Sequence, residues 1–137
     1  QCSEETIRFY CEKFLHKTGG PQSKSSTVIV PCPARSNKRQ HALRIALAMG
    51  SILNCEVSDC LQFAKGGSQL GQKKLNKIDR TNIKMVCKVA VASKNIIFVD
   101  DILTTGATAW AARRALPEDC NFEVWCLAQR CRVATNE

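Results

Sequence analysis

The sequence predicts a single α/β domain with a mostly parallel central sheet and helices on both faces. Its 137 residues are enough for one substantial core but not for two. Short apolar runs of strand length alternate with segments of helical spacing, and parallel strands require such crossover connections. The most apolar run, Ile96–Val99, is almost continuous, as expected of a strand that is covered on both faces.

The N-terminal half contains two helical segments with a strand between them. Residues 4–15 place apolar side chains at helical spacing, with Glu4 and Glu5 in the first turn, where the helix dipole favours acids. Thr27–Val30 is β-rich and predicts a short strand that stops at Pro31, and residues 42–53 predict a second helix. We therefore expect residues 1–26 to form a helix and a linker, which could serve as a small hood over the site. Residues 27–132 are expected to form the core.

The C-terminal half supplies the remaining elements. Strands are predicted near residues 60–64, loosely over 84–92, at 96–99 and at 122–128. Gly106 to Leu116 is predicted as a helix that is ended by Pro117.

The charge is unevenly distributed. The chain carries a net charge of +8, and residues 61–95 hold eight Lys or Arg against one acid, Asp79. Such a basic segment beside a balanced domain predicts a polyanionic ligand, either phosphates or nucleic acid.

Hydropathy and cysteine usage predict a cytoplasmic protein. No apolar run is long enough for a membrane span, and no signal peptide opens the sequence, so we expect no membrane association. The nine cysteines are scattered without a C-x-x-C pair, which favours reduced thiols over disulfides or a structural zinc site. Cys32, between two prolines, is interpreted as a packing residue rather than a nucleophile.

The segment from Ile96 to Thr108 carries the strongest signal of a site. Asp100 and Asp101 follow the apolar strand directly, at the end of a parallel sheet where ligands bind. Paired carboxylates accept hydrogen bonds from vicinal hydroxyls or help to hold a cation. A turn then opens a helix whose free amides and threonine hydroxyls suit a phosphate: Thr104, Thr105, Gly106, Ala107 and Thr108. Each piece alone is also compatible with helix capping and an ordinary turn.

In this order the residues resemble the phosphoribosyl-pyrophosphate (PRPP) motif of type I phosphoribosyltransferases. The resemblance implies the type I phosphoribosyltransferase fold, Asp100 and Asp101 on the ribose hydroxyls, and Thr104 to Thr108 on the 5-phosphate. It also implies that Mg²⁺ arrives bound to PRPP and that the protein has no dedicated metal site. Asp100 and Asp101 are the side chains that could contribute to holding the cation.

Two further stretches are similar to the ComF (competence protein F) branch of this family. V-I-V-P-C-P-A-R-S-N-K-R-Q, from Val28, resembles its first strand and basic loop, which implies that pyrophosphate is bound by Arg35, Ser36, Asn37, Lys38 and Arg39. The segment from Phe63 to Lys84 resembles its mobile catalytic loop, with Lys65 and Lys73 as catalytic candidates beside Asp100 and Asp101, and with Gln69 and Arg80 near the site. The ending L-A-Q-R places Arg130 there too. This branch usually opens with a four-cysteine zinc ribbon, which Cys2 and Cys11 cannot form, so no metal-binding finger is expected. Its usual G-F-N-Q after the basic loop is replaced here by Arg39-Gln40-His41.

The resemblance implies Mg²⁺-dependent transfer of a 5-phosphoribosyl group from PRPP to a nucleobase or another amine, with release of pyrophosphate. A non-catalytic ComF-like role in DNA uptake is the alternative, with nucleotide or single-stranded DNA as the ligand. Phe63 is the one aromatic residue in the basic segment 61–95, which argues against base stacking along it. A degenerate, purely structural domain is a third reading, and a homodimer is left open.

Overall fold

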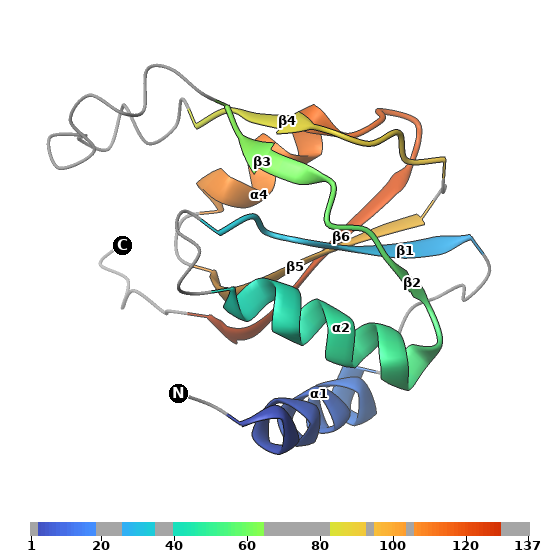
Figure 1. Ribbon diagram of the computed structural model, residues 1–137, viewed down its shortest axis with the longest axis vertical. Coiled ribbons are helices and arrows are strands. Elements are labelled where there is room, and N and C mark those ends of the chain that lie inside the picture. Colours follow the sequence, from blue (N-terminus) through green and yellow to red (C-terminus); the bar gives the residue numbers. More distant parts are fainter. Residues whose placement is uncertain are drawn as a thin grey trace, which may run out of the picture.

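The computed structural model describes residues 3–18, 26–34, 40–64, 83–92, 95–103 and 106–129. The elements in chain order are α1 (Glu4–Thr18), β1 (Thr27–Pro31), α2 (His41–Leu53), β2 (Glu56–Val57), β3 (Leu61–Phe63), β4 (Met85–Cys87), β5 (Asn95–Leu103), α4 (Ala107–Ala115) and β6 (Asn121–Gln129). Figure 1 shows α1 and α2 below the main sheet, and α4 with the β3–β4 pair above it.

The main sheet is parallel throughout and has the strand order β2-β1-β5-β6. β1 and β5 are the inner strands, and the register aligns Val28 with Ile96 and Pro31 with Val99. The predicted parallel sheet with helices on both faces is therefore confirmed. β2 was not predicted, because a two-residue strand is too short to show a hydrophobic period.

Several predicted bounds need correction. Pro31 does not end the strand before it but is the last residue of β1. Proline cannot donate a backbone hydrogen bond to the sheet, yet Pro31 still pairs with Val99. The strand predicted over residues 84–92 is only Met85–Cys87, since Val89 and Ala90 lie exposed beyond it. The strand predicted near residues 60–64 is β3, and it pairs with β4 in a separate antiparallel sheet instead of joining the parallel one.

The core between the sheet and α4 is filled by alternate residues of the inner strands. Val28, Val30, Ile96 and Phe98 point to this face. They pack with small residues of α4 and with the β3–β4 pair, through Ala109, Ala111, Ala112, Leu116, Cys60, Leu61 and Met85. Because α4 presents three alanines, it can lie close to the sheet.

The opposite face carries the other residues of the same strands. Ile29, Ile97 and Val99 pack here with the buried side chains of α2 and α1, namely Ile45, Ala46, Met49, Ile7 and Cys11, and with Trp125 of β6. The strict alternation between the two clusters explains why Ile96–Val99 is apolar without interruption: each residue faces one core or the other.

Helix α1 is fixed to this second face. The Phe14 ring lies 5.2 Å from the Trp125 ring, between centroids, and Arg44 of α2 forms an ion pair with Glu4 at 3.0 Å. α1 thus covers α2 and β6 on the side of the sheet away from α4 (Figure 1). A role for it as a hood over an acceptor stays a prediction.

Candidate functional site

Asp100 and Asp101 lie at the C-terminal end of the inner strand β5. They do not follow the strand, as the sequence suggested, but belong to it, because β5 continues to pair with β6 as far as Leu103 opposite Gln129. Since β1, β5 and β6 are parallel, their C-terminal ends meet at one edge of the sheet (Figure 1). Open α/β sheets bind ligands outside this edge.

The two carboxyl groups contact each other. Asp101 donates its backbone N–H to Asp100 Oδ1 at 2.8 Å, and a side-chain hydrogen bond also links the two residues. Strand alternation would send Asp100 to the α4 face, with Phe98, and Asp101 to the α2 face, with Val99. The hydrogen bonds show that the carboxyls nevertheless remain within reach of one another and can act on one ligand.

Asp100 has an unusual acidity for a carboxylic acid. Burial raises the pKa of its side chain to about 7, and the side-chain hydrogen bond that protonated Asp100 donates to Asp101 acts in the same direction. Near neutral pH this carboxyl exchanges between a form that donates a hydrogen bond and a form that only accepts them. Shifted pKa values of this kind cluster at functional sites, although buried structural pairs also produce them.

The helix that follows β5 begins at Gly106. This residue has a left-handed backbone with φ of 81°, and Trp110 donates its N–H to the Gly106 carbonyl at 2.9 Å, which closes the first turn of α4. Gly106 stands at the N-cap without a side-chain cap hydrogen bond, and the positive end of the helix dipole at this turn favours an anion. Ala107 and Thr108 are half-buried in this turn, whereas Thr104 and Thr105 lie outside the described residues.

The end of β1 reaches the same edge beside Asp100. Cys32 donates its N–H to the Val99 carbonyl at 2.8 Å, and its side chain packs against the core on the α4 side. The Cys32 side chain therefore packs against the core, as expected. The predicted pyrophosphate loop, Arg35, Ser36, Asn37, Lys38 and Arg39, begins after Ala34 and lies outside the described residues.

The β3–β4 pair brackets the other predicted loop. Ala64 donates its N–H to the Lys84 carbonyl at 2.9 Å, so the chain leaves β3 and returns to β4 at one place. Arg114 of α4 donates to the Ile83 carbonyl at 3.2 Å, which fixes the start of β4 near this helix. The candidates between these strands, Lys65, Gln69, Lys73 and Arg80, lie outside the described residues, as does Arg130 after β6.

Sequence reasoning missed Cys126, which the sheet brings beside the paired acids. Cys126 of β6 is the register partner of Asp100 and is half-buried. Its neighbours Val124 and Phe122, two and four residues earlier on the strand, line the α4 side. Strand alternation in the sequence indicates which face of β6 carries Cys126. It does not indicate which residue of β5 lies beside it, because that depends on the register between β5 and β6.

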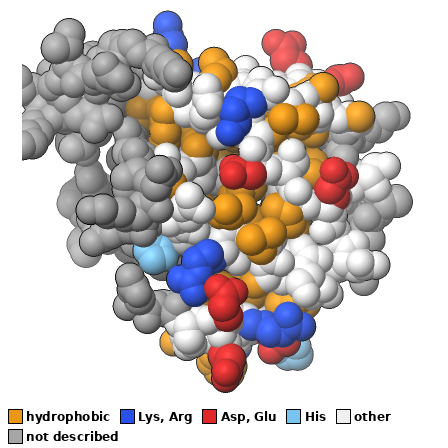
Figure 2. Space-filling view, in the orientation of Figure 1, with side chains coloured by type: hydrophobic (Ala, Val, Ile, Leu, Met, Phe, Trp, Pro, Cys, Tyr) orange, Lys and Arg blue, Asp and Glu red, His pale blue; other side chains and the backbone are white. Residues whose placement is uncertain are grey.

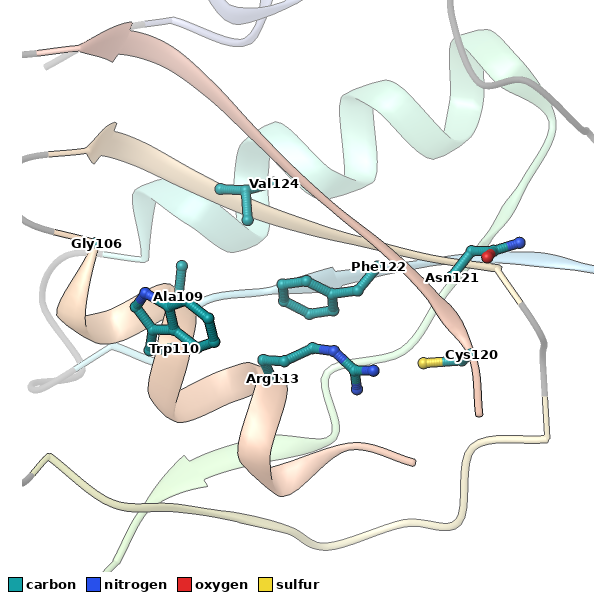
Figure 3. Close-up of a pocket in the computed structure, with 8 residues that line it drawn as sticks. All are labelled: Gly106, Ala109, Trp110, Arg113, Cys120, Asn121, Phe122 and Val124. Carbon is teal, nitrogen blue, oxygen red and sulfur yellow. The ribbon is translucent and has the colours of Figure 1, made fainter. Parts of the chain in front are cut away.

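A pocket of about 460 Å³ also escaped prediction. It lies between α4 and β6 and is lined by Gly106, Ala109, Trp110, Arg113, Cys120, Asn121, Phe122 and Val124. Figure 3 shows the Trp110 and Phe122 rings on its wall and the Arg113 side chain across one end. The Arg113 guanidinium is held in place by hydrogen bonds that it donates to the carbonyls of Pro117 and Glu118, both at 2.9 Å. Among the described residues, Gly106 alone is shared by this pocket and the strand-end site.

Charges on the described surface are mixed. In Figure 2 the Lys and Arg side chains lie among Asp and Glu side chains rather than gathering by sign on the described part of this face. Of the eight basic residues in the segment 61–95, only Lys84 and Lys88 are described. The predicted polyanion-binding charge therefore falls mainly outside the described residues.

Neither metal ligation nor a membrane span adds to this site within the described ranges. No three His, Cys, Asp or Glu side chains converge there in a way that could hold a metal ion. None of the described helices combines the length and hydropathy needed to cross a membrane.

Several solved phosphoribosyltransferases share this fold. A purine phosphoribosyltransferase from Pyrococcus horikoshii matches with a TM-score of 0.56 at 18% identity, covering 93% of this chain and 75% of that one. A hypoxanthine phosphoribosyltransferase from Staphylococcus aureus matches with a TM-score of 0.58 at 19% identity, covering 98% and 70%. An orotate phosphoribosyltransferase from Aeropyrum pernix gives 0.53 at 14% identity, covering 93% and 73%.

These similarities define the class of the fold, that of the type I phosphoribosyltransferases, and so confirm the predicted fold class. At such low identities the likeness extends to the fold alone. The sequence itself matches no protein-family model and no curated protein sequence.

Proposed function

We propose that this protein binds PRPP and transfers its 5-phosphoribosyl group to a nucleobase or another amine. The observation that carries the proposal is the arrangement at the end of β5, where two adjacent acids, Asp100 and Asp101, joined by the Asp101 N–H to the Asp100 carboxyl, are followed by a helix with Gly106 at its N-cap. Ribose hydroxyls need acceptors, and a phosphate needs amide donors at a helix start. The arrangement offers both on a single strand–loop–helix unit.

In this proposal each part of PRPP has its own partners. Asp100 and Asp101 accept hydrogen bonds from the ribose hydroxyls. Gly106, Ala107 and Thr108 at the start of α4, with Thr104 and Thr105 before them, bind the 5-phosphate. The basic residues Arg35, Lys38 and Arg39, with Ser36 and Asn37, face pyrophosphate. Lys65 and Lys73, with Gln69, Arg80 and Arg130 near them, belong to the surrounding loops.

The donor set suits Mg²⁺ that arrives with the substrate. Two carboxylates are oxygen ligands of the kind that Mg²⁺ prefers, yet they cannot complete six-fold coordination alone. PRPP would supply further oxygens, and the cation would neutralise charge on the leaving pyrophosphate. A cation beside Asp100 would also favour its ionised form, which lowers the pKa of this carboxyl from about 7.

The chemistry requires little from the protein besides positioning. The acceptor nitrogen attacks the anomeric carbon while the bond to pyrophosphate breaks, and the sugar passes through an oxocarbenium-like state. Holding the ribose rigidly and stabilising the leaving charge accelerate such a step, and loss of one charge-stabilising contact typically costs about 10²- to 10³-fold.

A narrower assignment to a ComF-like role is supported only by the sequence likeness of residues 28–40, 63–84 and 127–130. In a non-catalytic form of that role, the same site would bind PRPP or a nucleotide without transfer. Binding of single-stranded DNA by the basic loops would show a steep loss of affinity with rising salt, and a flat salt titration of oligonucleotide binding would remove it.

The transfer is tested by measuring pyrophosphate release from PRPP and Mg²⁺ with adenine, hypoxanthine or orotate as acceptors. We expect release that depends on at least one base, and loss of that activity in Asp100→Asn with Asp101→Asn. Binding of PRPP without any base-dependent release would overturn transfer and leave a binding protein. Absence of PRPP binding would overturn the site itself.

A further inference from the structure

Two cysteines far apart in the sequence meet at one end of the β3–β4 pair. Cys60 directly precedes Leu61, which is the register partner of Cys87. Lys88 donates its N–H to the Cys60 carbonyl at 2.7 Å, which holds the two backbones together at this point. The Cys60 side chain belongs to the core cluster on the α4 side, and the Cys87 side chain packs against the same cluster, close enough to influence the pKa of the Cys60 thiol.

The two thiols differ in their access to solvent. Cys60 is fully buried, with 0% of its surface exposed, and this burial raises the pKa of its thiol to about 11. Cys87 is only half-buried, and its Sγ lies 2.9 Å from the Val89 carbonyl, which is on the exposed side of the turn. A small oxidant in solution therefore reaches Cys87 before it reaches Cys60.

The strands that these cysteines join are weakly held. β3 and β4 have three residues each and, within the described ranges, pair only with one another. A two-stranded ribbon is marginally stable by itself, so the pair depends on Leu61 and Met85 packing against the α4 side of the core. A disulfide between the strands would therefore stabilise the pair beyond what their few hydrogen bonds provide.

We propose that Cys60 and Cys87 are a redox pair whose oxidation by a hydroperoxide forms a disulfide that locks β3 to β4. The Cys87 sulfur attacks a peroxide oxygen, the O–O bond breaks, and Cys87 becomes a sulfenic acid as water or an alcohol leaves. The Cys60 sulfur then attacks Cys87, an S–S bond forms, the S–O bond breaks, and the Cys60 proton leaves with the hydroxyl as water. Two thiols lose two electrons to one hydroperoxide, and an external dithiol reverses the change.

The disulfide is compatible with its setting. Cys60 stands opposite Lys88, one position from the register partner of Cys87, and both cysteine side chains pack in the same core cluster, on the one side that a disulfide between them requires. Because the link ties β3 to β4 in the unfolded chain as well, it reduces the entropy gained on opening, and the oxidised protein should resist unfolding better than the reduced one. This inference does not depend on PRPP binding.

The test treats the complete protein with hydrogen peroxide under native conditions, alkylates the remaining thiols, and maps disulfides by mass spectrometry after tryptic digestion. The expected product links the peptide of residues 45–65 to that of residues 85–88, and it is lighter than the two reduced peptides by two hydrogen atoms. Since the first peptide also contains Cys55, Cys55→Ser is the matched control and should retain the link. Cys60→Ser and Cys87→Ser should each abolish it.

A second measurement keeps the inference testable if Cys60→Ser folds poorly. The melting temperature of the oxidised wild type should exceed that of the reduced form by at least about 3 °C and should return on treatment with dithiothreitol. Cys87→Ser, which changes a half-buried side chain, should show no such redox-dependent difference. A different pairing, or a Cys60–Cys87 link that leaves the melting temperature unchanged or lower, would overturn the proposal.

Discussion

Asp101 donates its backbone N–H to the Oδ1 atom of Asp100 at 2.8 Å, so the first of the paired acids is held by the residue that follows it. The bond turns the Asp100 carboxyl toward its neighbour, and burial together with the side-chain hydrogen bond raises the pKa of Asp100 to about 7. Ionising the Asp100 carboxyl in the unliganded protein therefore costs free energy of folding.

We expect Asp100→Asn to stabilise the unliganded protein above neutral pH. The folded-state pKa of about 7 lies above the ordinary 3.8, so the folded protein holds the extra proton between these values. This contribution to stability is complete below about pH 4 and is lost as pH rises through 7. Since Asp100 is partly solvated, we expect a gain of roughly 1–2 kcal/mol at pH 8 rather than the full linkage value.

Urea unfolding of wild type and variant between pH 4 and 8 measures this gain. The difference between the two free energies of unfolding should grow over that range. Asp59→Asn, which alters an exposed carboxylate, serves as the control and should produce no comparable gain. A difference that stays constant with pH, or a destabilised Asp100→Asn, would contradict the prediction.

Gly106→Ala should destabilise the protein by about 1 kcal/mol because φ at this residue is 81°. An added Cβ would meet no atom within 4 Å, so the cost would be conformational rather than steric. Asparagine tolerates the left-handed region better, and Gly106→Asn should therefore lose less stability than Gly106→Ala. Equal losses in chemical denaturation would contradict this explanation.

Gly50→Ala tests a close approach between α2 and β2. A Cβ here would lie 2.5 Å from Val57 Cγ2 and 3.0 Å from the Cys55 carbonyl oxygen. We expect a loss of about 1–3 kcal/mol in spite of the better helix propensity of alanine. Val57→Ala in the same chain should recover part of the loss, and a double-mutant cycle that is strictly additive would show that the two sites do not meet.

Helix α1 should be held mainly by its apolar side. Ile7 is 6% exposed in the core beside α2, whereas Phe9 on the same helix is 53% exposed. Ile7→Ala should cost about 2–4 kcal/mol, and Phe9→Ala should change the free energy of unfolding by no more than about 0.5 kcal/mol. Similar losses for both variants, measured by urea unfolding, would show that α1 packs differently.

The sequence predicted the elements that carry a long hydrophobic period or a clear boundary. β5 is apolar at every inner position because its residues alternate between two cores, and α4 is bounded by Gly106 and Pro117. Asp100 and Asp101 could be placed at the edge of the sheet because ligand sites in parallel sheets lie at the C-terminal ends of strands. These inferences need no knowledge of which strands are neighbours.

What could not be predicted depends on contacts between distant segments. β2 forms only because Glu56 and Val57 pair with β1, and β3 turns away from the parallel sheet because Gln62 pairs with Val86. The pKa of Asp100 follows from burial, and Cys126 is placed beside Asp100 by the register between β5 and β6. Neither burial nor register is encoded in local spacing.

The central claim, a PRPP site at Asp100, Asp101 and the start of α4, is tested most directly by the melting temperature with and without PRPP and Mg²⁺. A ligand that binds only the native protein raises this temperature. We expect a rise for the wild type and for Glu118→Gln with Asp119→Asn, which removes two exposed acids beyond α4. Asp100→Asn with Asp101→Asn should show none, whatever its melting temperature without ligand. An unchanged wild type, or an equal rise in the Asp100 and Asp101 variant, would contradict the account.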